Sequence, residues 1–155
     1  MATQGFYETG LYRILTDLNL TSTTLKCMLL KTTAAWNPDE AVVGTSLTAA
    51  ELSCTNYTGA YGGAGRKACT ITGNANATDN RADFAVADQT WTTLGGASND
   101  TIGAAALIYE DTSDAVSVPI VFWDVTNTPT NGGNITLDHP TLVAGGSLQI
   151  SVGTP

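Results

Sequence analysis

The side chains that could do chemistry are few, and they do not form a recognisable catalytic set. His139 is the single histidine of the chain, and it precedes Pro140, which favours an extended backbone at His139. One histidine cannot build a histidine-based metal cluster, and no serine or cysteine nucleophile pattern accompanies it. We therefore interpret His139 as a structural or surface residue.

Two acidic runs could offer oxygen ligands to a calcium ion. Glu110, Asp111 and Asp114 form one run, and Asp79 and Asp83 form the other. Neither has the EF-hand spacing with its central glycine and terminal glutamate. Nothing in the sequence selects a carboxylate pair for glycoside hydrolysis, so a hydrolase is the least supported function. We expect acid-rich surface turns, no metal, no cofactor and no enzymatic activity.

A glycine-rich stretch, NYTGAYGGAG at residues 56–65, invites comparison with a phosphate-binding loop. The required glycine, four residues and Gly-Lys-Ser/Thr are absent, because Gly65 is followed by Arg66, Lys67 and Ala68. We expect an irregular connection in which several glycines adopt positive φ.

The three cysteines are an odd number and form no CxxC motif. Cys27 shares a strand face with Leu25 and Leu29, and Cys69 shares one with Ile71. We expect small buried hydrophobic side chains in a reducing cytoplasm. The alternative is one disulfide and one free thiol.

Composition indicates a folded, mainly β domain that spans residues 1–155. Hydrophobic residues make up 43% of the chain and charged residues 13%, against a usual charged share of about 25%. Abundant threonine favours strands, while glycine and asparagine favour turns. The net charge is -8 and the basic residues are scattered, which argues against nucleic-acid binding. We expect neither a secretory signal nor a membrane-spanning segment.

Two apolar runs, residues 104–111 and 118–125, organise the predicted fold as a hairpin. Strict alternation would place Val118, Ile120 and Phe122 on one face. It would place Val121, Trp123 and Val125 on the other face. Since both faces are apolar, this hairpin lies between two layers of its own fold or presents one face to another chain.

The remaining pattern predicts about eight strands and two short helical segments. Leu11, Ile14, Leu15 and Leu18 have helical spacing, which predicts a short helix over residues 7–17 after a possible N-terminal arm at residues 1–10. Thr48 and Glu51 have capping-box spacing and predict a helical turn through Leu52. Further strands are expected at residues 24–31, 68–72, 82–86, 90–94, 135–138 and 148–152, with turns at 73–80 and 126–134. This spacing predicts an antiparallel β-sandwich, either jelly-roll or immunoglobulin-like.

The run LYRILTDLNLTSTTLKCMLLKTTAAWNPDE, residues 11–40, resembles the opening of small accessory virion structural proteins of tailed bacteriophages. The shared pattern is a short helix, a strand of the form Leu-x-Leu-x-Ser/Thr-x-Thr-hydrophobic-Lys-hydrophobic-x-Leu-Leu, and a polar Asn/Pro/Asp turn. Residues 18–30 match the strand pattern. Later segments, ELS at 51–53, AALIYED at 105–111 and VPIVFWDV at 118–125, are similar to the family in the same order. The sequence FWDV at 122–125 departs from the family's aspartate–aromatic–glycine ending.

The resemblance implies an accessory capsid or other virion protein with a β-sandwich fold that binds other virion subunits. Our first hypothesis is a protein that decorates the outer capsid and stabilises it by bridging major capsid protein subunits. Such a protein would be made in the bacterial host cytoplasm and would reside in the virion, and closed symmetry favours a homotrimer. The alternative is a tail or fibre module that binds a host-surface glycan through Trp36 or Tyr61. Our candidate partner-binding residues are Phe6, Tyr7, Leu11, Tyr12, Trp36, Tyr57, Tyr61 and Trp123.

Overall fold

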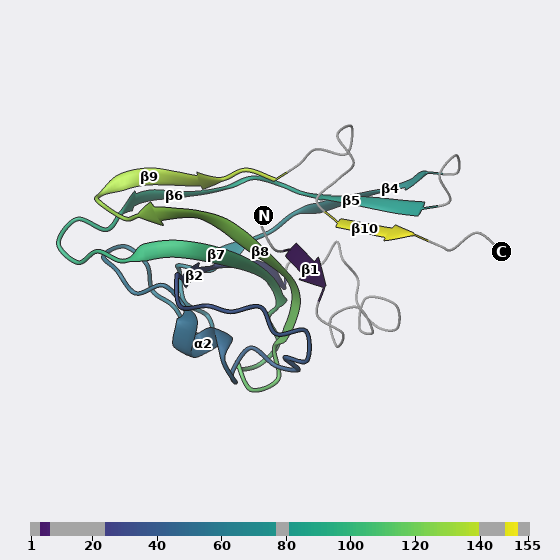
Figure 1. Ribbon diagram of the computed structural model, residues 1–155, viewed down its shortest axis with the longest axis horizontal. Coiled ribbons are helices and arrows are strands. Elements are labelled where there is room, and N and C mark those ends of the chain that lie inside the picture. The colour runs from purple at the N-terminus through teal and green to yellow at the C-terminus, as the bar shows by residue number, and fades with distance from the viewer. Residues whose placement is uncertain (1–3, 7–23, 77–80, 140–147, 152–155) are drawn as a thin grey trace.

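The chain is mainly β-structure with antiparallel sheets. The computed structural model describes residues 4–6, 24–76, 81–139 and 148–151. The largest sheet has five strands in the order β1-β8-β7-β2-β3 (Figure 1). Its strands are β1 (Gln4–Phe6), β2 (Leu25–Lys31), β3 (Lys67–Ala68), β7 (Thr101–Tyr109) and β8 (Val118–Pro129).

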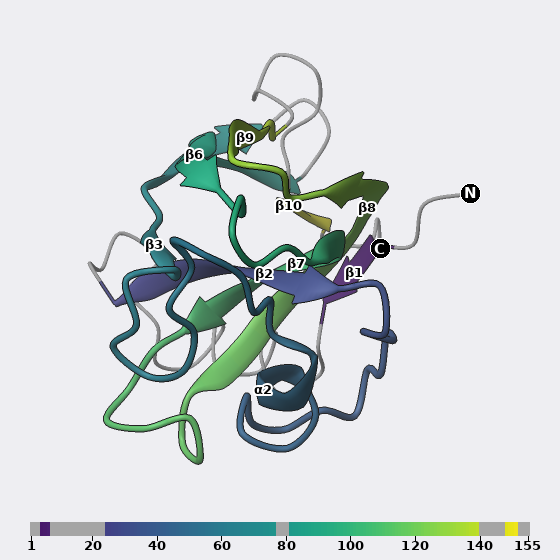
Figure 2. The same ribbon diagram turned by 90° about the vertical axis from the view of Figure 1, so that its left-hand side faces the viewer.

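Two smaller sheets complete the β-structure of the described residues. One has the order β10-β5-β4 and contains β4 (Ile71–Asn76), β5 (Arg81–Val86) and β10 (Leu148–Ser151). The other is the pair of β6 (Gln89–Leu94) and β9 (Gly133–Leu137). A single helical turn, α2 (Leu47–Ala50), lies on the opposite side of the five-stranded sheet from β6 and β9 (Figure 2).

The five-stranded sheet is buried on both faces by other parts of the same chain. On one face, Leu29, Leu107 and Trp123 pack in a cluster with Trp91 and Leu94 of β6. On the other face, a second cluster joins the sheet to Val43 and Leu47 near α2; its sheet members are Met28, Leu30, Ala104, Ala106, Ile108 and Phe122. The apolar hairpin therefore lies between two layers of its own fold, the first of the two arrangements expected from its sequence.

A β-bulge changes which face one hairpin residue occupies. Leu107 pairs with Val121 but Ile108 pairs with Pro119, so β8 contains one more residue than β7 at Ile120. Ile120 consequently joins the same core cluster as Val121, and Phe122 alone of the predicted face lies in the other cluster. The predicted strict alternation is wrong at Ile120 because a bulge inserts an unpaired residue.

Several predicted boundaries also differ from the structure. β4 extends to Asn76 through part of the predicted 73–80 turn, because residues 71–76 pair with β5. β8 extends to Pro129 and β9 begins at Gly133, so the predicted 126–134 turn is shorter. Residues 68–72 do not form one strand but divide between β3 and β4, which belong to different sheets.

The predicted capping box is also wrong. Ser46 is the N-cap of α2, and Glu51 is its C-cap. The Thr48 hydroxyl donates a hydrogen bond to the Val43 carbonyl. The buried Glu40 carboxylate accepts hydrogen bonds from the Ser46 N–H and hydroxyl, each at 2.8 Å. The Glu51 side chain is occupied elsewhere, as described below.

Part of the predicted N-terminal arm belongs to the large sheet. Gln4–Phe6 pair antiparallel with β8, where Gln4 faces Trp123 and Phe6 faces Val121. The predicted helix over residues 7–17 lies outside the described residues.

Candidate functional site

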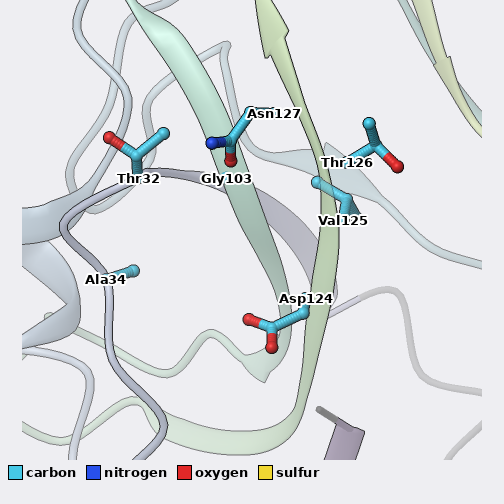
Figure 3. A pocket seen from close by; sticks show the side chains of 7 residues that line it. All are labelled: Thr32, Ala34, Gly103, Asp124, Val125, Thr126 and Asn127. Carbon is cyan, nitrogen blue, oxygen red and sulfur yellow. The ribbon is translucent and has the colours of Figure 1, made fainter. Parts of the chain in front are cut away.

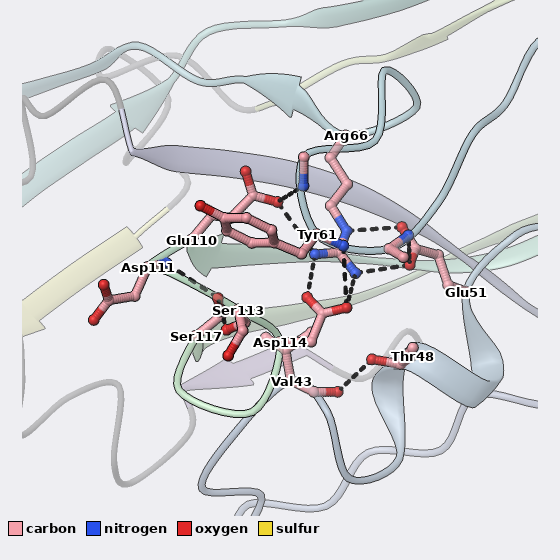
Figure 4. Close-up of polar contacts among 12 residues, drawn as sticks. Val43, Thr48, Glu51, Tyr61, Arg66, Glu110, Asp111, Ser113, Asp114 and Ser117 are labelled. Atoms are coloured by element: carbon pink, nitrogen blue, oxygen red, sulfur yellow. Dashed lines mark hydrogen bonds and ion pairs between the residues drawn. The ribbon is translucent and has the colours of Figure 1, made fainter.

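Arg66 is the centre of a buried ion network where the glycine-rich stretch meets the hairpin. Its side chain has no exposed surface. Its Nε and Nη2 atoms donate to the two oxygens of Glu51 at 2.9 and 2.8 Å. Its Nη1 atom donates to Glu110 Oε1 at 3.2 Å and to Asp114 Oδ1 (Figure 4). One guanidinium therefore joins three carboxylates from two separate parts of the sequence.

The same three carboxylates also bind consecutive backbone N–H groups. Ala60 donates to Glu51 at 2.8 Å, Tyr61 donates to Asp114 at 3.2 Å and Gly62 donates to Glu110 at 3.3 Å. Residues 56–66 are thereby fixed against residues 110–117, the loop between β7 and β8. We refer to these two loops together as the tip.

Electrostatic contacts keep the Arg66 guanidinium charged. Burial by itself would lower the pKa of the guanidinium. Hydrogen bonds and negative charge from Glu51 and Asp114 outweigh this effect and raise the Arg66 pKa above its ordinary value. A buried guanidinium held by bidentate contacts to a carboxylate is a geometrically specific connection.

Tyr57 and Trp91 attach the tip to the core. The Tyr57 hydroxyl accepts the Leu29 N–H at 3.0 Å and donates to Glu51 at 3.2 Å. Burial and the Glu51 charge raise the pKa of Tyr57 well above its usual value, so the hydroxyl keeps the proton that it donates. Trp91 Nε1 donates to the Gly65 carbonyl at 2.6 Å.

Close packing, more than backbone freedom, explains the glycines of this loop. Only Gly62 has positive φ among the glycines of residues 56–65, while Asn56 and Ala60 also adopt it. The expectation of positive φ at several glycines is therefore wrong. At Gly65, a Cβ atom would lie 2.8 Å from the Tyr57 ring, so a side chain would displace the buried tyrosine.

The hairpin loop is ordered by its own hydrogen bonds. The buried Ser117 hydroxyl donates to the Ser113 carbonyl at 2.7 Å and accepts the Asp111 N–H at 3.0 Å. The Gly44 N–H donates to the Asp114 carbonyl at 2.8 Å, which ties the loop to the layer that contains α2.

Two apolar side chains of the tip are exposed to solvent. Tyr61 is 49% exposed and Val116 is 46% exposed. Among the described residues, these two are the large hydrophobic side chains that are exposed. Tyr61 belongs to one loop of the tip and Val116 to the other. An aromatic ring on an ordered backbone is a common centre of a protein contact.

A separate polar pocket of about 440 Å³ lies at the other end of the hairpin. Its lining residues are Thr32, Ala34, Gly103, Asp124, Val125, Thr126 and Asn127. Asp124 and Asn127 point from β8 toward the loop with Thr32, whereas Thr126 points to the other side of the strand (Figure 3). The carboxylate, carboxamide and hydroxyl groups of this lining suit a polar ligand without negative charge.

Irregular strand pairing creates this pocket. Ile102 and Ala104 of β7 pair with Thr128 and Asp124 of β8, so one residue of β7 lies opposite three residues of β8. On the other side of β7, Ile102 and Ala104 pair with the adjacent residues Lys31 and Leu30 of β2, so Gly103 has no pairing partner on β2. A Cβ atom on Gly103 would lie 2.6 Å from Thr32 Cα, so the close approach of the two backbones requires glycine.

The predicted partner-binding residues fall in different environments. Tyr57 and Tyr61 share the tip, but Tyr57 is buried and only Tyr61 offers surface. Trp36 is half-buried and packs on Phe122 at the side of the core, with ring centroids 5.7 Å apart. Trp123 is buried in the core. Phe6 lies in β1, while Tyr7, Leu11 and Tyr12 lie outside the described residues.

The other residues considered for chemistry have structural environments. The His139 ring packs on Trp123 with ring centroids 4.8 Å apart, and the backbone N–H of His139 donates to Asp88 Oδ1 at 2.7 Å. The Nε2 atom of His139 is buried and has no partner among the described residues. Burial lowers the His139 pKa, against the opposing charges of Asp88 and Asp138. All three cysteines are free thiols, with Cys27 and Cys69 buried and Cys54 half-buried.

Sequence reasoning did not identify Arg66, Glu51 or the polar pocket. The spacing of Thr48 and Glu51 predicts a helix cap instead, and the scattered distribution of the basic residues does not single out Arg66. A signal for Arg66 existed, because it follows a glycine-rich run directly and the chain has only six lysines and arginines.

Comparisons with protein families, curated proteins and solved structures found no match to this chain. Within the described residues, no group of three or more His, Cys, Asp or Glu side chains is placed to hold a metal ion. No helix in that part of the chain is long and apolar enough to cross a membrane.

Proposed function

We propose that this chain is a non-enzymatic structural protein of a tailed-bacteriophage virion, which decorates the outer capsid and bridges major capsid protein subunits. The observation that carries the proposal is the tip, where Tyr61 and Val116 stand exposed on two loops fixed by the buried Arg66 network. The bacteriophage setting and the capsid partner rest on the sequence resemblance.

The geometry of the tip supports a contact role. Residues 60–62 are already held by carboxylates through their backbone N–H groups, so binding would not have to order them. Pre-organised loops avoid part of the entropic cost of association. The Arg66 guanidinium has no exposed surface and its donors face three carboxylates, which favours a positioning role over a chemical one.

The arrangement of the sheets supports an antiparallel β-sandwich. Core residues from β2, β7 and β8 pack against Ile71, Val86 and Trp91, which belong to the two smaller sheets. We propose a homotrimer as the assembled form, because closed cyclic symmetry is the common solution for identical subunits. A trimer would present three tips to the shell.

Co-sedimentation with capsids that lack the protein tests this function. We expect saturable binding and a higher melting temperature of the decorated shells, because a ligand that binds only the intact shell stabilises it by mass action. The double substitution Tyr61→Ala and Val116→Ala should weaken binding while the melting temperature of the free protein stays unchanged. Thr90→Ala on β6 is a control, since its exposed side chain lies in the layer opposite α2. Absence of binding by the unmodified protein would overturn the proposal.

The alternative function is glycan binding by a tail or fibre module. The polar pocket favours it, because carboxylate, carboxamide and hydroxyl groups hydrogen-bond to sugar hydroxyls, and Ala34 of its lining lies two residues from Trp36. A glycan array probed with the unmodified protein and with Trp36→Ala and Asp124→Ala separates the two functions. Binding that both substitutions abolish would favour the glycan function, and no binding to any glycan would count against it.

A further inference from the structure

The charged side chains with exposed surface on the tip are all carboxylates. Arg66, the only base within residues 56–66 and 110–117, has a fully buried side chain. Glu110 and Asp114 retain 9% and 16% side-chain exposure beside it, and Asp111 is exposed. On these two loops, Tyr61 and Val116 therefore share the exposed surface with carboxylates and with no exposed base.

We infer that the tip binds a basic protein surface, in which lysine or arginine side chains surround a shallow apolar depression that contacts Tyr61 and Val116. This inference rests on the proposed function and specifies the chemistry of the partner that meets the tip. The chain carries a net charge of -8, so its overall field also attracts a basic partner. The two nearest bases along the strands behind the tip, Lys26 of β2 and Lys67 of β3, are half-buried.

The Arg66 network makes the carboxylates suitable for a second cation. Glu110 and Asp114 each hold Arg66 and a backbone N–H of the opposite loop, so their positions are fixed before a partner arrives. A partner guanidinium or ammonium would meet carboxylates that need no rearrangement. Because such steering acts mainly on the association rate, the contact should weaken as salt concentration rises.

Charge reversal at Asp111 tests the inference with little risk to the fold. The hydrogen bond from Asp111 to Ser117 uses the backbone N–H, so Asp111→Lys leaves that contact intact. Asp138→Lys is the matched control, since Asp138 is exposed, follows β9 in another layer and gives the same change in net charge. Melting curves would confirm that both variants are folded.

The primary measurement is capsid binding as a function of sodium chloride concentration. We expect Asp111→Lys to weaken binding by about tenfold at low salt and to flatten its salt dependence, while Asp138→Lys behaves as the unmodified protein does. Tyr61→Ala should weaken binding without changing the salt dependence. Equal binding by the two lysine variants, or binding of the unmodified protein that ignores salt, would overturn the inference.

A second measurement separates this inference from the capsid proposal. An arginine-rich peptide is titrated into the isotopically labelled protein, and backbone amide shifts are followed by NMR. We expect the largest shifts at Tyr61, Gly62 and Asp111, and their loss in Asp111→Lys but not in Asp138→Lys. If capsids are not bound but these shifts appear, the capsid assignment fails and the basic-partner inference stands. Shifts of equal size around Asp138 and the tip would overturn the inference itself.

Discussion

The two ends of the β7–β8 hairpin are shaped by different physical means. At the closed end, residues 110–117 are joined to the glycine-rich loop by a buried guanidinium and three carboxylates. At the open end, β2, β7 and β8 lose their regular register around Gly103, and a polar pocket forms between them. Ion pairs determine the conformation of the closed end, while the irregular strand pairing around Gly103 determines the shape of the open end.

The difference shows how one hairpin can carry a projecting surface at one end and a recess at the other. The middle of the hairpin is apolar on both faces and forms the core. The closed end contains long charged side chains that reach across to another loop. The open end has glycine where a strand crosses the backbone of Thr32, and this allows a concave site.

Replacing Arg66 should produce the largest effect and should affect the closed end. Arg66→Met leaves Glu51 buried without its positive partner, and breaking a buried ion pair in this way costs about 3–5 kcal/mol. Chemical denaturation would measure the loss in the free energy of unfolding. Faster hydrogen exchange at the Ala60, Tyr61 and Gly62 amides would show that the tip has loosened.

Lys67→Met provides the control for this substitution. It removes the same charge one residue later, from a half-buried position on β3. Equal losses of stability in the two variants would show that the Arg66 network does not order the tip.

A methyl group at Gly103 should have an intermediate effect at the open end. In Gly103→Ala the new Cβ atom would meet Thr32 Cα at 2.6 Å, so the backbone of one strand must shift. Such overpacking costs about 1–3 kcal/mol, which thermal or chemical unfolding can measure.

Gly133→Ala is the matched control, because its Cβ atom would meet only the flexible Asn131 side chain, at 3.2 Å. Hydrogen exchange at Ala60–Gly62 should remain unchanged in Gly103→Ala. Loosening of the tip in this variant would mean that the two ends are coupled and that the comparison fails.

Acidification should have the smallest effect and should act through the middle of β8, where His139 packs on Trp123. Burial lowers the pKa of His139 in the folded chain, whereas a histidine in the unfolded chain has a pKa of about 6.5. As the pH falls below about 6.5, the unfolded state therefore binds a proton before the folded state does. The free energy of unfolding decreases from this pH down to the pKa of the folded chain.

The melting temperature measured between pH 7.5 and pH 5.5 would report this loss. His139→Gln should remove the part of the pH dependence that comes from the imidazole. An identical fall in melting temperature in this variant would assign the pH dependence to other groups.

The strands of the hairpin were predictable because their signal is local. The apolar runs at 104–111 and 118–125 correspond to β7 and β8, and both faces are buried as their composition implied. The bulge at Ile120 was not predictable, because it depends on which residues of β7 lie opposite. The additional residues near Gly103 have the same origin.

The candidate site was predictable only in part. Tyr57 and Tyr61 are both candidate contact residues from the sequence, but only Tyr61 is exposed. Tyr57 is buried, and its hydroxyl is hydrogen-bonded to Leu29 and Glu51. The carboxylates of the Arg66 network lie 15 to 48 positions from Arg66 along the chain. No spacing rule for a single element detects such a cluster.

That separation along the chain has a consequence for folding and assembly. Glu51, Arg66, Glu110 and Asp114 can meet only after the five-stranded sheet has brought distant segments together, and contacts of high sequence separation form slowly. We therefore expect the tip to be completed late in folding. A chain whose five-stranded sheet is incomplete would lack the surface that we propose for binding. Incompletely folded subunits would therefore fail to join the assembly, and no additional quality-control step would be needed to exclude them.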